Sequence, residues 1–173
     1  SLELGCDSDS KTPLHWSICL SGQSPAYQAV SALLIKSGAD VNATDCWGTS
    51  VLASAVATGT VATVRLLISA GAVDLDGALR AAIENGKHRN CAPLLRAGAA
   101  RPVRYTARGP GYEPPGYSET CEYMRKIRAA GGYRAYENAH RQRLVAIFAP
   151  KFPRLPADML GRVLEFTWDI GGH

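Results

Sequence analysis

Three segments of this chain share one pattern, in which a short apolar stretch is followed by a glycine. In two of them the distance is the same, because Leu52 precedes Gly71 by 19 positions and Leu79 precedes Gly98 by 19 positions. The segment that comes first in the chain, residues 12–43, also ends in a run that contains Gly-Ala. Units that recur at such a spacing pack on their neighbours, because one helical hairpin cannot bury its apolar face alone. The sequence therefore predicts a stack of repeated units.

Each repeat contains two short amphipathic stretches, which indicates a pair of helices. In the second repeat, Leu52, Ala55 and Val56 fall on one face of a helix, and Val64, Leu66 and Leu67 fall on one face of the next. Hydrophobic residues make up 46% of the chain and charged residues 20%, which is typical of a folded globular protein. We therefore expect an all-α fold whose core lies between the stacked hairpins.

The first copy opens with Thr-Pro-Leu-His at positions 12–15 and ends with Gly-Ala-Asp-Val-Asn at positions 38–42. These residues resemble the ankyrin repeat, whose signature joins T-P-L-H to L-L-x-x-G-A-D-V-N. The resemblance implies an ankyrin-repeat solenoid, an all-α stack of helix-turn-helix units that binds other proteins. It assigns residues 1–100 to repeats at 7–44, 45–73 and 74–100.

The copies differ in detail, and four local expectations follow. Repeat one is five residues longer than repeat two, so we expect a longer inter-helix loop around residues 20–25. Repeat three has lost most of its β-turn finger around residues 73–77. Pro93 falls in the second helix of that repeat, which we expect to start late and be short because proline lacks a backbone N–H. Gly59 and Gly71 stand at helix ends and are expected to take positive φ.

Residues 101–117 contain four prolines and three glycines and show no apolar periodicity. Such a composition predicts an extended, semi-stiff connection. It is either a plain linker or a strap laid along the protein or a partner. In the second case three tyrosines would be its anchors, namely Tyr105, Tyr112 and Tyr117.

Residues 118–173 are predicted to form a C-terminal helical cap on the open end of the stack. A helix capped by Ser118 runs through Ala129, a second carries apolar residues at spacings of three and four up to Phe148, and a third begins after Pro156. A cap buries its apolar side chains, so burial is expected for Leu144, Phe148, Val163 and Phe166.

Two further resemblances concern this C-terminal part. Residues 123–173 are similar to a block that follows ankyrin repeats in expanded protein sets of marine microalgae. That block has no established activity. We expect the ankyrin module to be a linker subunit docked on a larger assembly, which the apparent algal source suggests is an organellar or photosynthetic membrane complex. Residues 155–166 are similar to the opening of an F-box, which implies a substrate adaptor of a ubiquitin ligase. Only seven residues follow Phe166, whereas an F-box needs further helices, so a capping helix is the first interpretation.

The residue that most strongly indicates partner binding is Trp47, between Asp45 and Gly48 in a turn that follows the family pattern D-x-x-G-x-T, with Ser50 in place of its threonine. Burial inside the stack is not expected there, and an aromatic side chain offers a large, rigid contact. Trp16, at a usually apolar inner-helix position, is expected to be mostly buried. In the family the other fingertip positions and the ends of the inner helices line the concave surface, and here they are Ser8, Asp9, Lys11, Cys46, Thr49, Ala57, Thr58, Glu84 and Asn85.

Positive charge is concentrated after the repeats. Residues 1–100 carry seven Lys and Arg against eight Asp and Glu, whereas residues 101–173 carry twelve against seven. These basic residues can face solvent, an acidic protein, an anionic membrane surface or nucleic acid. No base-reading motif accompanies them, so nucleic acid is not the expected partner. The predicted basic patch consists of Arg125, Lys126, Arg128, Arg134, Arg141, Arg143, Lys151 and Arg154.

No pattern in the sequence points to catalysis, to a cofactor or to a metal. His15 belongs to the T-P-L-H motif, where it orients a turn by hydrogen bonding, and the other histidines lack partners at metal-ligand spacing. Five cysteines without a C-x-x-C pair indicate buried or incidental thiols in a reducing compartment, the cytoplasm or an organelle stroma. We therefore expect a non-enzymatic interaction protein with no small-molecule substrate, no transmembrane segment and no visible targeting segment.

Overall fold

The computed structural model describes residues 11–100, 117–154, 156 and 158–163 of the 173-residue chain. The chain divides into two compact units, Ser1–Cys121 and Glu122–His173. Within the described residues the regular elements are helices, accompanied by an isolated antiparallel bridge between Thr44 and Ser50. The predicted all-α fold is confirmed.

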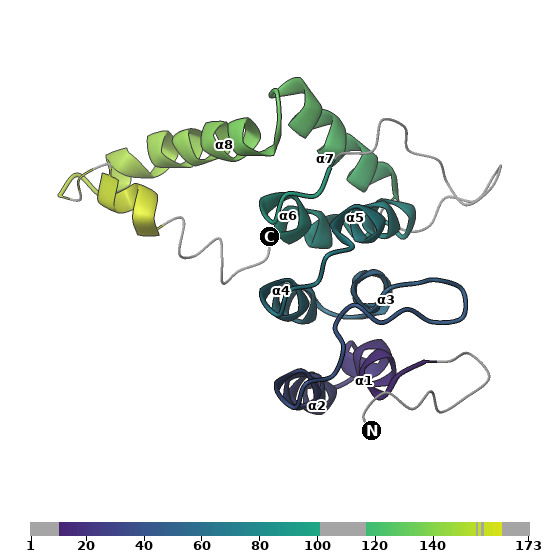
Figure 1. Cartoon of the computed structure of the whole chain (residues 1–173). Coiled ribbons are helices and arrows are strands. Elements are labelled where there is room, and N and C mark those ends of the chain that lie inside the picture. Colours follow the sequence, from purple (N-terminus) through teal and green to yellow (C-terminus); the bar gives the residue numbers. More distant parts are fainter. Residues whose placement is uncertain (1–10, 101–116, 155, 157, 164–173) are drawn as a thin grey trace. The chain divides into compact units, whose positions relative to one another are not determined.

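The first unit contains three helical hairpins that stack in two layers (Figure 1). Along the first layer α3 packs against both α1 and α5, and along the second α4 packs against α6. Three stacked hairpins are the architecture that the repeated spacing predicts, so the stack is confirmed. The first layer holds α1 (Pro13–Ser21), α3 (Val51–Thr58) and α5 (Leu75–Glu84), and the second holds α2 (Pro25–Lys36), α4 (Val61–Ser69) and α6 (His88–Arg96).

The first helix of each hairpin begins with a polar residue that caps its first turn. Thr12 Oγ1 accepts a hydrogen bond from the backbone N–H of His15 at 3.4 Å, and Ser50 Oγ accepts one from the N–H of Ala53 at 3.1 Å. Asp74 caps α5 in the same way. Because these caps satisfy N–H groups that have no partner inside the helix, the local sequence sets where each hairpin begins.

The core of the first unit is formed by aliphatic side chains of the stacked helices. Leu52 and Val56 of α3, Ile18 of α1 and Leu79 of α5 have no exposed surface. Since Leu52 and Val56 belong to the amphipathic pattern of repeat two, the predicted apolar face of that helix is confirmed. Burial of such side chains between neighbouring hairpins is the main favourable contribution to the stability of the stack.

Polar side chains tie successive repeats together at their turns. Asn42 Oδ1 accepts a hydrogen bond from the backbone N–H of Val73 at 3.0 Å, and Asn42 Nδ2 donates one to the carbonyl oxygen of Gly71 at 3.4 Å. Ser50 Oγ donates to Asp74 Oδ2 at 2.6 Å. Asn42 ends the G-A-D-V-N run of repeat one, so this signature residue joins that run to the end of repeat two.

The extra length of repeat one lies mainly in its helices, so the predicted long inter-helix loop is wrong. Helix α2 has 12 residues where α4 has 9, and α1 has 9 where α3 has 8. The loop at residues 22–24 is only one residue longer than the loop at residues 59–60. Ser24 caps α2 and Pro25 occupies its first position, where a missing N–H costs nothing, so the second helix starts early.

The expectation for Pro93 is also wrong. Helix α6 begins at His88, five residues before Pro93, and has 9 residues, like α4. Pro93 removes one hydrogen bond from the helix but is buried there beside Leu94 and Leu95. Packing of this buried segment offsets the lost bond and keeps the helix continuous.

The two helix-end glycines serve different purposes. Gly71 has the expected positive φ of 93°, but Gly59 has φ −83° and ψ −169°, which corrects the prediction for that residue. A Cβ at Gly59 would lie 2.7 Å from the carbonyl oxygen of Ala55 and 3.2 Å from Ser21 Oγ. Lack of space, rather than backbone conformation, therefore requires glycine at position 59.

The predicted loss of a finger in repeat three is confirmed. Between α2 and α3 the chain runs through residues 37–50 and forms a finger closed by the bridge between Thr44 and Ser50. Between α4 and α5 only residues 70–74 intervene. Of these two connections, only the one between α2 and α3 contains a complete finger, which is formed by residues 44–50.

The helices after the repeats are α7 (Tyr117–Ala129), α8 (Tyr133–Phe148) and a short 3-10 turn, η1 (Ala149–Lys151). Residues 158–163 form a further helical stretch. Gly131 and Gly132 separate α7 from α8 with φ of 84° and 137°, values that glycine adopts without a Cβ penalty. The predicted helices are confirmed where they are described, but α7 begins at Tyr117, so Ser118 is not its N-cap.

The apolar side chains predicted to be buried after the repeats are not fully buried where they are described. Val163 is exposed, and Leu144 and Phe148 are only half-buried. Helix α8 has no fully buried residue, because its apolar positions alternate with charged ones and its C-terminal end packs on the short η1 turn. Phe166 lies outside the described residues. The capping role of this segment stays a prediction.

Aromatic side chains join α7 to α8. The rings of Tyr123 and Tyr136 meet edge-on with their centroids 5.6 Å apart, and Tyr136 stacks on His140 at 6.2 Å. Among the described residues of the second unit, the buried aliphatic side chains are Met124 and Ile127 of α7 and Leu160 of the stretch 158–163. Of the three predicted strap anchors, Tyr117 is buried in the first turn of α7, whereas Tyr105 and Tyr112 lie outside the described residues.

Candidate partner-binding surface

The tip of the finger at residues 44–50 is a turn held by one buried carboxylate. Asp45 Oδ1 accepts hydrogen bonds from the backbone N–H of Trp47 at 3.0 Å and from that of Thr49 at 2.8 Å. The N–H of Gly48 donates to the carbonyl oxygen of Asp45 at 3.0 Å, and Gly48 has φ 72°. These bonds fix the backbone on both sides of Trp47. The D-x-x-G-x-T pattern therefore describes a rigid turn.

Side chains at this tip point to solvent. Trp47 is 65% exposed, Cys46 is exposed and Thr49 is half-buried. The predicted exposure of Trp47 is confirmed, and its role in binding stays a prediction. A rigid turn that holds a large aromatic side chain in water is typical of a contact surface.

Trp16 is also at the surface, so its predicted burial is wrong. It is 40% exposed on α1, whereas Leu14, His15 and Ile18 of the same helix are buried. Those three side chains occupy the sides of α1 that pack on α2 and α3, and this leaves Trp16 on the remaining face. The apolar signature position does not by itself decide burial, because the neighbouring hairpin covers only part of the helix circumference.

Lys11 brings the two exposed tryptophans into one site. Its Nζ lies 5.2 Å from the ring centroid of Trp16 and 5.5 Å from the ring centroid of Trp47. Both distances are within the range of a cation–π contact. We call these three residues the tryptophan-lysine cluster. The sequence pattern placed Lys11 and Trp47 on the binding surface but missed Trp16.

The other predicted surface residues lie farther along the inner helices. Ala57 is half-buried and Thr58 exposed at the C-terminal end of α3, and Glu84 and Asn85 are half-buried at the end of α5. Trp47 instead precedes the N-terminal end of α3. The structure therefore places the predicted residues at opposite ends of the inner helices rather than in one cluster. Ser8 and Asp9 lie outside the described residues.

His15 connects the first helix to the finger. It is fully buried, its Nδ1 lies 3.0 Å from Thr12 Oγ1, and its Nε2 lies 3.4 Å from the carbonyl oxygen of Thr49. The predicted structural role in hydrogen bonding is confirmed. Burial lowers the pKa of His15 below its ordinary value of 6.5, a shift that the Thr49 carbonyl and Asp45 oppose and Lys11 reinforces.

This lowered pKa predicts a loss of stability on acidification. The unfolded chain binds a proton at His15 at higher pH than the folded chain, so the stability due to neutral His15 is present above pH 6.5 and lost below it. We expect the free energy of unfolding to fall between pH 7.5 and 5.5, by no more than about 1.4 kcal/mol per pH unit from this group. In His15→Gln the decrease should be smaller. Urea unfolding of the wild-type and variant proteins at each pH gives the free energy of unfolding. Equal decreases in the two proteins would contradict the prediction.

The predicted basic residues spread over several elements of the second unit. Most are exposed, and Lys126 Nζ forms an ion pair with Glu122 Oε1 at 2.9 Å on the surface of α7. This pair lowers the pKa of Glu122 through a hydrogen bond and the charge of Lys126. Arg125, Lys126 and Arg128 lie on α7, Arg134, Arg141 and Arg143 on α8, Lys151 in η1, and Arg154 after it.

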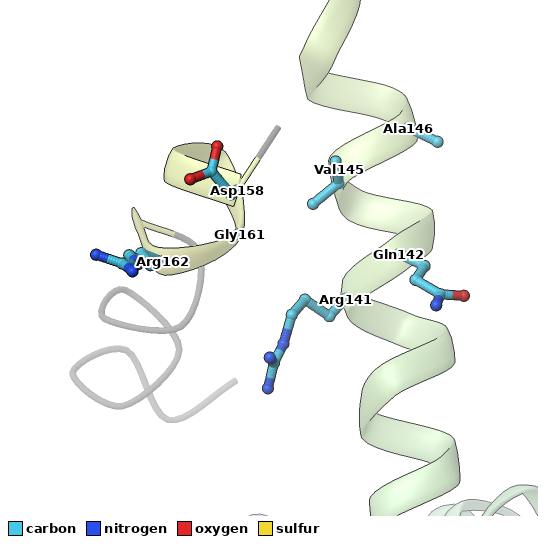
Figure 2. Close-up of a pocket in the computed structure, with 7 residues that line it drawn as sticks. All are labelled: Arg141, Gln142, Val145, Ala146, Asp158, Gly161 and Arg162. Carbon is cyan, nitrogen blue, oxygen red and sulfur yellow. The ribbon is translucent and has the colours of Figure 1, made fainter. Parts of the chain in front are cut away.

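A groove of about 440 Å³ lies between α8 and the helical stretch at residues 158–163 (Figure 2). Val145 and Arg141 of α8 point into the space between the two elements, and Arg162 lines the groove from the other side. Arg162 was not among the predicted basic residues. Its position across the groove from α8 follows from the return of the chain after η1.

One thiol of the repeats, that of Cys91, is buried. Burial raises the pKa of the Cys91 thiol to about 12, with a smaller contribution from Cys121, so Cys91 is not a thiolate near neutral pH. Among the described residues, no three His, Cys, Asp or Glu side chains gather as a metal site would require. None of the helices in those residues is both long and apolar enough to cross a bilayer.

Comparison with known proteins agrees with this architecture. A family model described as ankyrin repeats matches residues 23–104 in three copies. No curated protein shows significant similarity to the chain. The stacked hairpins and the match define an all-α repeat protein. Residues 23–104 are therefore ankyrin repeats, and ankyrin repeats are generally protein-protein interaction modules.

Proposed function

We propose that this chain is a non-enzymatic scaffold or linker protein that docks a partner protein on the surface around Trp47. The observation that carries the proposal is a 65% exposed tryptophan on a turn whose backbone is fixed by Asp45. A preorganised aromatic side chain loses little conformational freedom on binding and buries a large area. The surface supports contact with another macromolecule rather than chemistry on a small one.

The state of the titratable groups supports a binding role over catalysis. Both ring nitrogens of His15 lie within hydrogen-bond distance of protein groups, and burial keeps the thiol of Cys91 protonated. Neither group is therefore prepared to act as a base or nucleophile. The F-box alternative depends on residues 155–166, which lie partly outside the described residues, and stays a second hypothesis.

Trp47→Ala is expected to weaken partner capture about 30-fold, or about 2 kcal/mol, without measurable loss of folding. The reason is that Trp47 is a contact residue outside the core. The partner is identified by co-purification with the full chain and mass spectrometry, and its dissociation constant is then measured by calorimetry. Leu33→Ala is the matched control, because Leu33 is 62% exposed on α2, in the other layer of the stack, and its removal should leave the affinity unchanged.

A second pair of variants distinguishes the basic patch from the finger. Arg125 and Arg134 are exposed on α7 and α8, and neither takes part in the ion pair between Lys126 and Glu122. Arg125→Glu with Arg134→Glu should leave the affinity at moderate salt nearly unchanged if the finger is the docking surface. If Trp47→Ala binds normally while this charge reversal abolishes capture, the proposed surface is wrong and the basic patch docks the partner.

A further inference from the structure

The tryptophan-lysine cluster joins two parts of the chain that are 31 positions apart in sequence. Trp16 lies on α1 and Trp47 at the fingertip, and one ammonium group is within 5.5 Å of both ring centroids. Each indole nevertheless keeps a large exposed area, 40% for Trp16 and 65% for Trp47. The site therefore holds a cation on the protein surface without sealing either ring from water.

The chemistry of this site favours the guanidinium group of arginine over the ammonium group of lysine. The faces of indole rings carry negative potential and attract cations. A lysine ammonium is compact and strongly hydrated, whereas the guanidinium of arginine is planar, more weakly hydrated and able to stack on an aromatic face. A guanidinium placed where Lys11 Nζ lies would contact the same two rings at a lower cost of removing water.

We propose that Trp16 and Trp47 form a binding site for an arginine side chain of the partner protein, and that Lys11 occupies this site in the free protein. The inference rests on the proposed function, since it names the partner chemistry that the finger surface recognises. On binding, the arginine displaces Lys11, whose flexible side chain returns to water. The turn held by Asp45 keeps Trp47 in place during this exchange, because its hydrogen bonds do not involve Lys11.

Displacement of Lys11 predicts an effect that would not be seen if the two tryptophans bound the partner without competition from Lys11. Lys11 competes with the incoming arginine for the rings and repels it by like charge. Removing the ammonium should therefore strengthen arginine binding, by about two- to fivefold for a cation–π contact at an exposed site. A simple loss of a surface contact would have the opposite sign or no effect.

The experiment follows the indole N–H signals of the isotope-labelled full chain by NMR. The probe is the peptide acetyl-Gly-Arg-Gly-amide, and the control is the same peptide with citrulline, which keeps the shape of arginine but is neutral. We expect the signals of Trp16 and Trp47 to shift saturably with the arginine peptide and far less with the citrulline peptide. The signal of Trp168 serves as an internal reference, and Trp→Phe variants assign all three.

Lys11→Gln should bind the arginine peptide two- to fivefold more tightly, and Trp47→Ala should lose the binding. Equal shifts with the two peptides would overturn the proposal, as would unchanged or weaker binding in Lys11→Gln. Failure of the proposed function gives a different result, namely normal partner capture by Trp47→Ala. If Trp47→Ala impairs capture while the citrulline peptide binds as well as the arginine peptide, the finger is the docking surface but the arginine proposal is wrong.

Discussion

Leu52→Ala is expected to destabilise the repeat stack by about 3 kcal/mol. Leu52 has no exposed surface and lies on α3, which packs against both α1 and α5. The smaller side chain loses burial and leaves a cavity that two neighbouring hairpins cannot both close. Urea unfolding followed by circular dichroism at 222 nm gives the change in the free energy of unfolding.

Leu33→Ala is the control for this measurement. Leu33 is 62% exposed on α2, so its removal should change the free energy of unfolding by less than about 0.5 kcal/mol. A similar decrease in the free energy of unfolding in the two variants would show that Leu52 is not part of the packed core. It would also contradict the stacking of α3 between two hairpins.

Gly22→Ala is expected to destabilise the same unit by roughly 3 kcal/mol, by overcrowding rather than by a cavity. Gly22 has φ −70° and ψ −19°, which alanine adopts readily, so the backbone conformation is not the obstacle. A Cβ at this position would lie 2.5 Å from the carbonyl oxygen of Thr58 in the next repeat. Because that oxygen belongs to the backbone, the two turns must move apart.

The control for the glycine variant is Gly161→Ala. A Cβ there would meet no other atom within 4 Å, and Gly161 lies in the helical stretch 158–163, where alanine is favoured over glycine. Stability should stay the same or rise slightly, by at most about 1 kcal/mol. If Gly22→Ala proves as harmless as Gly161→Ala, the close approach of the two inter-helix turns is wrong.

Where the determinants are local, the sequence was a sufficient guide. The positive φ of Gly71 followed from the sequence, because it depends on the backbone of one residue at a helix end. The exposure of Trp47 also followed from the sequence, because the turn at residues 45–49 closes within five residues. Local rules failed for Gly59, whose restriction comes from the nearby Ser21 Oγ as well as from Ala55 of its own helix.

The amino-acid sequence by itself determined the number of repeats, the two helices of each and the finger that carries Trp47. These depend on spacings of a few residues and on caps within one turn of helix. Only the tertiary structure decided that Trp16 stays exposed, that Lys11 lies over two indoles and that Arg162 lines a groove opposite α8. Those features depend on how much of each helix its neighbour covers and on the return path of the chain. Both are set by packing between segments distant in sequence, and no spacing along the chain reports them.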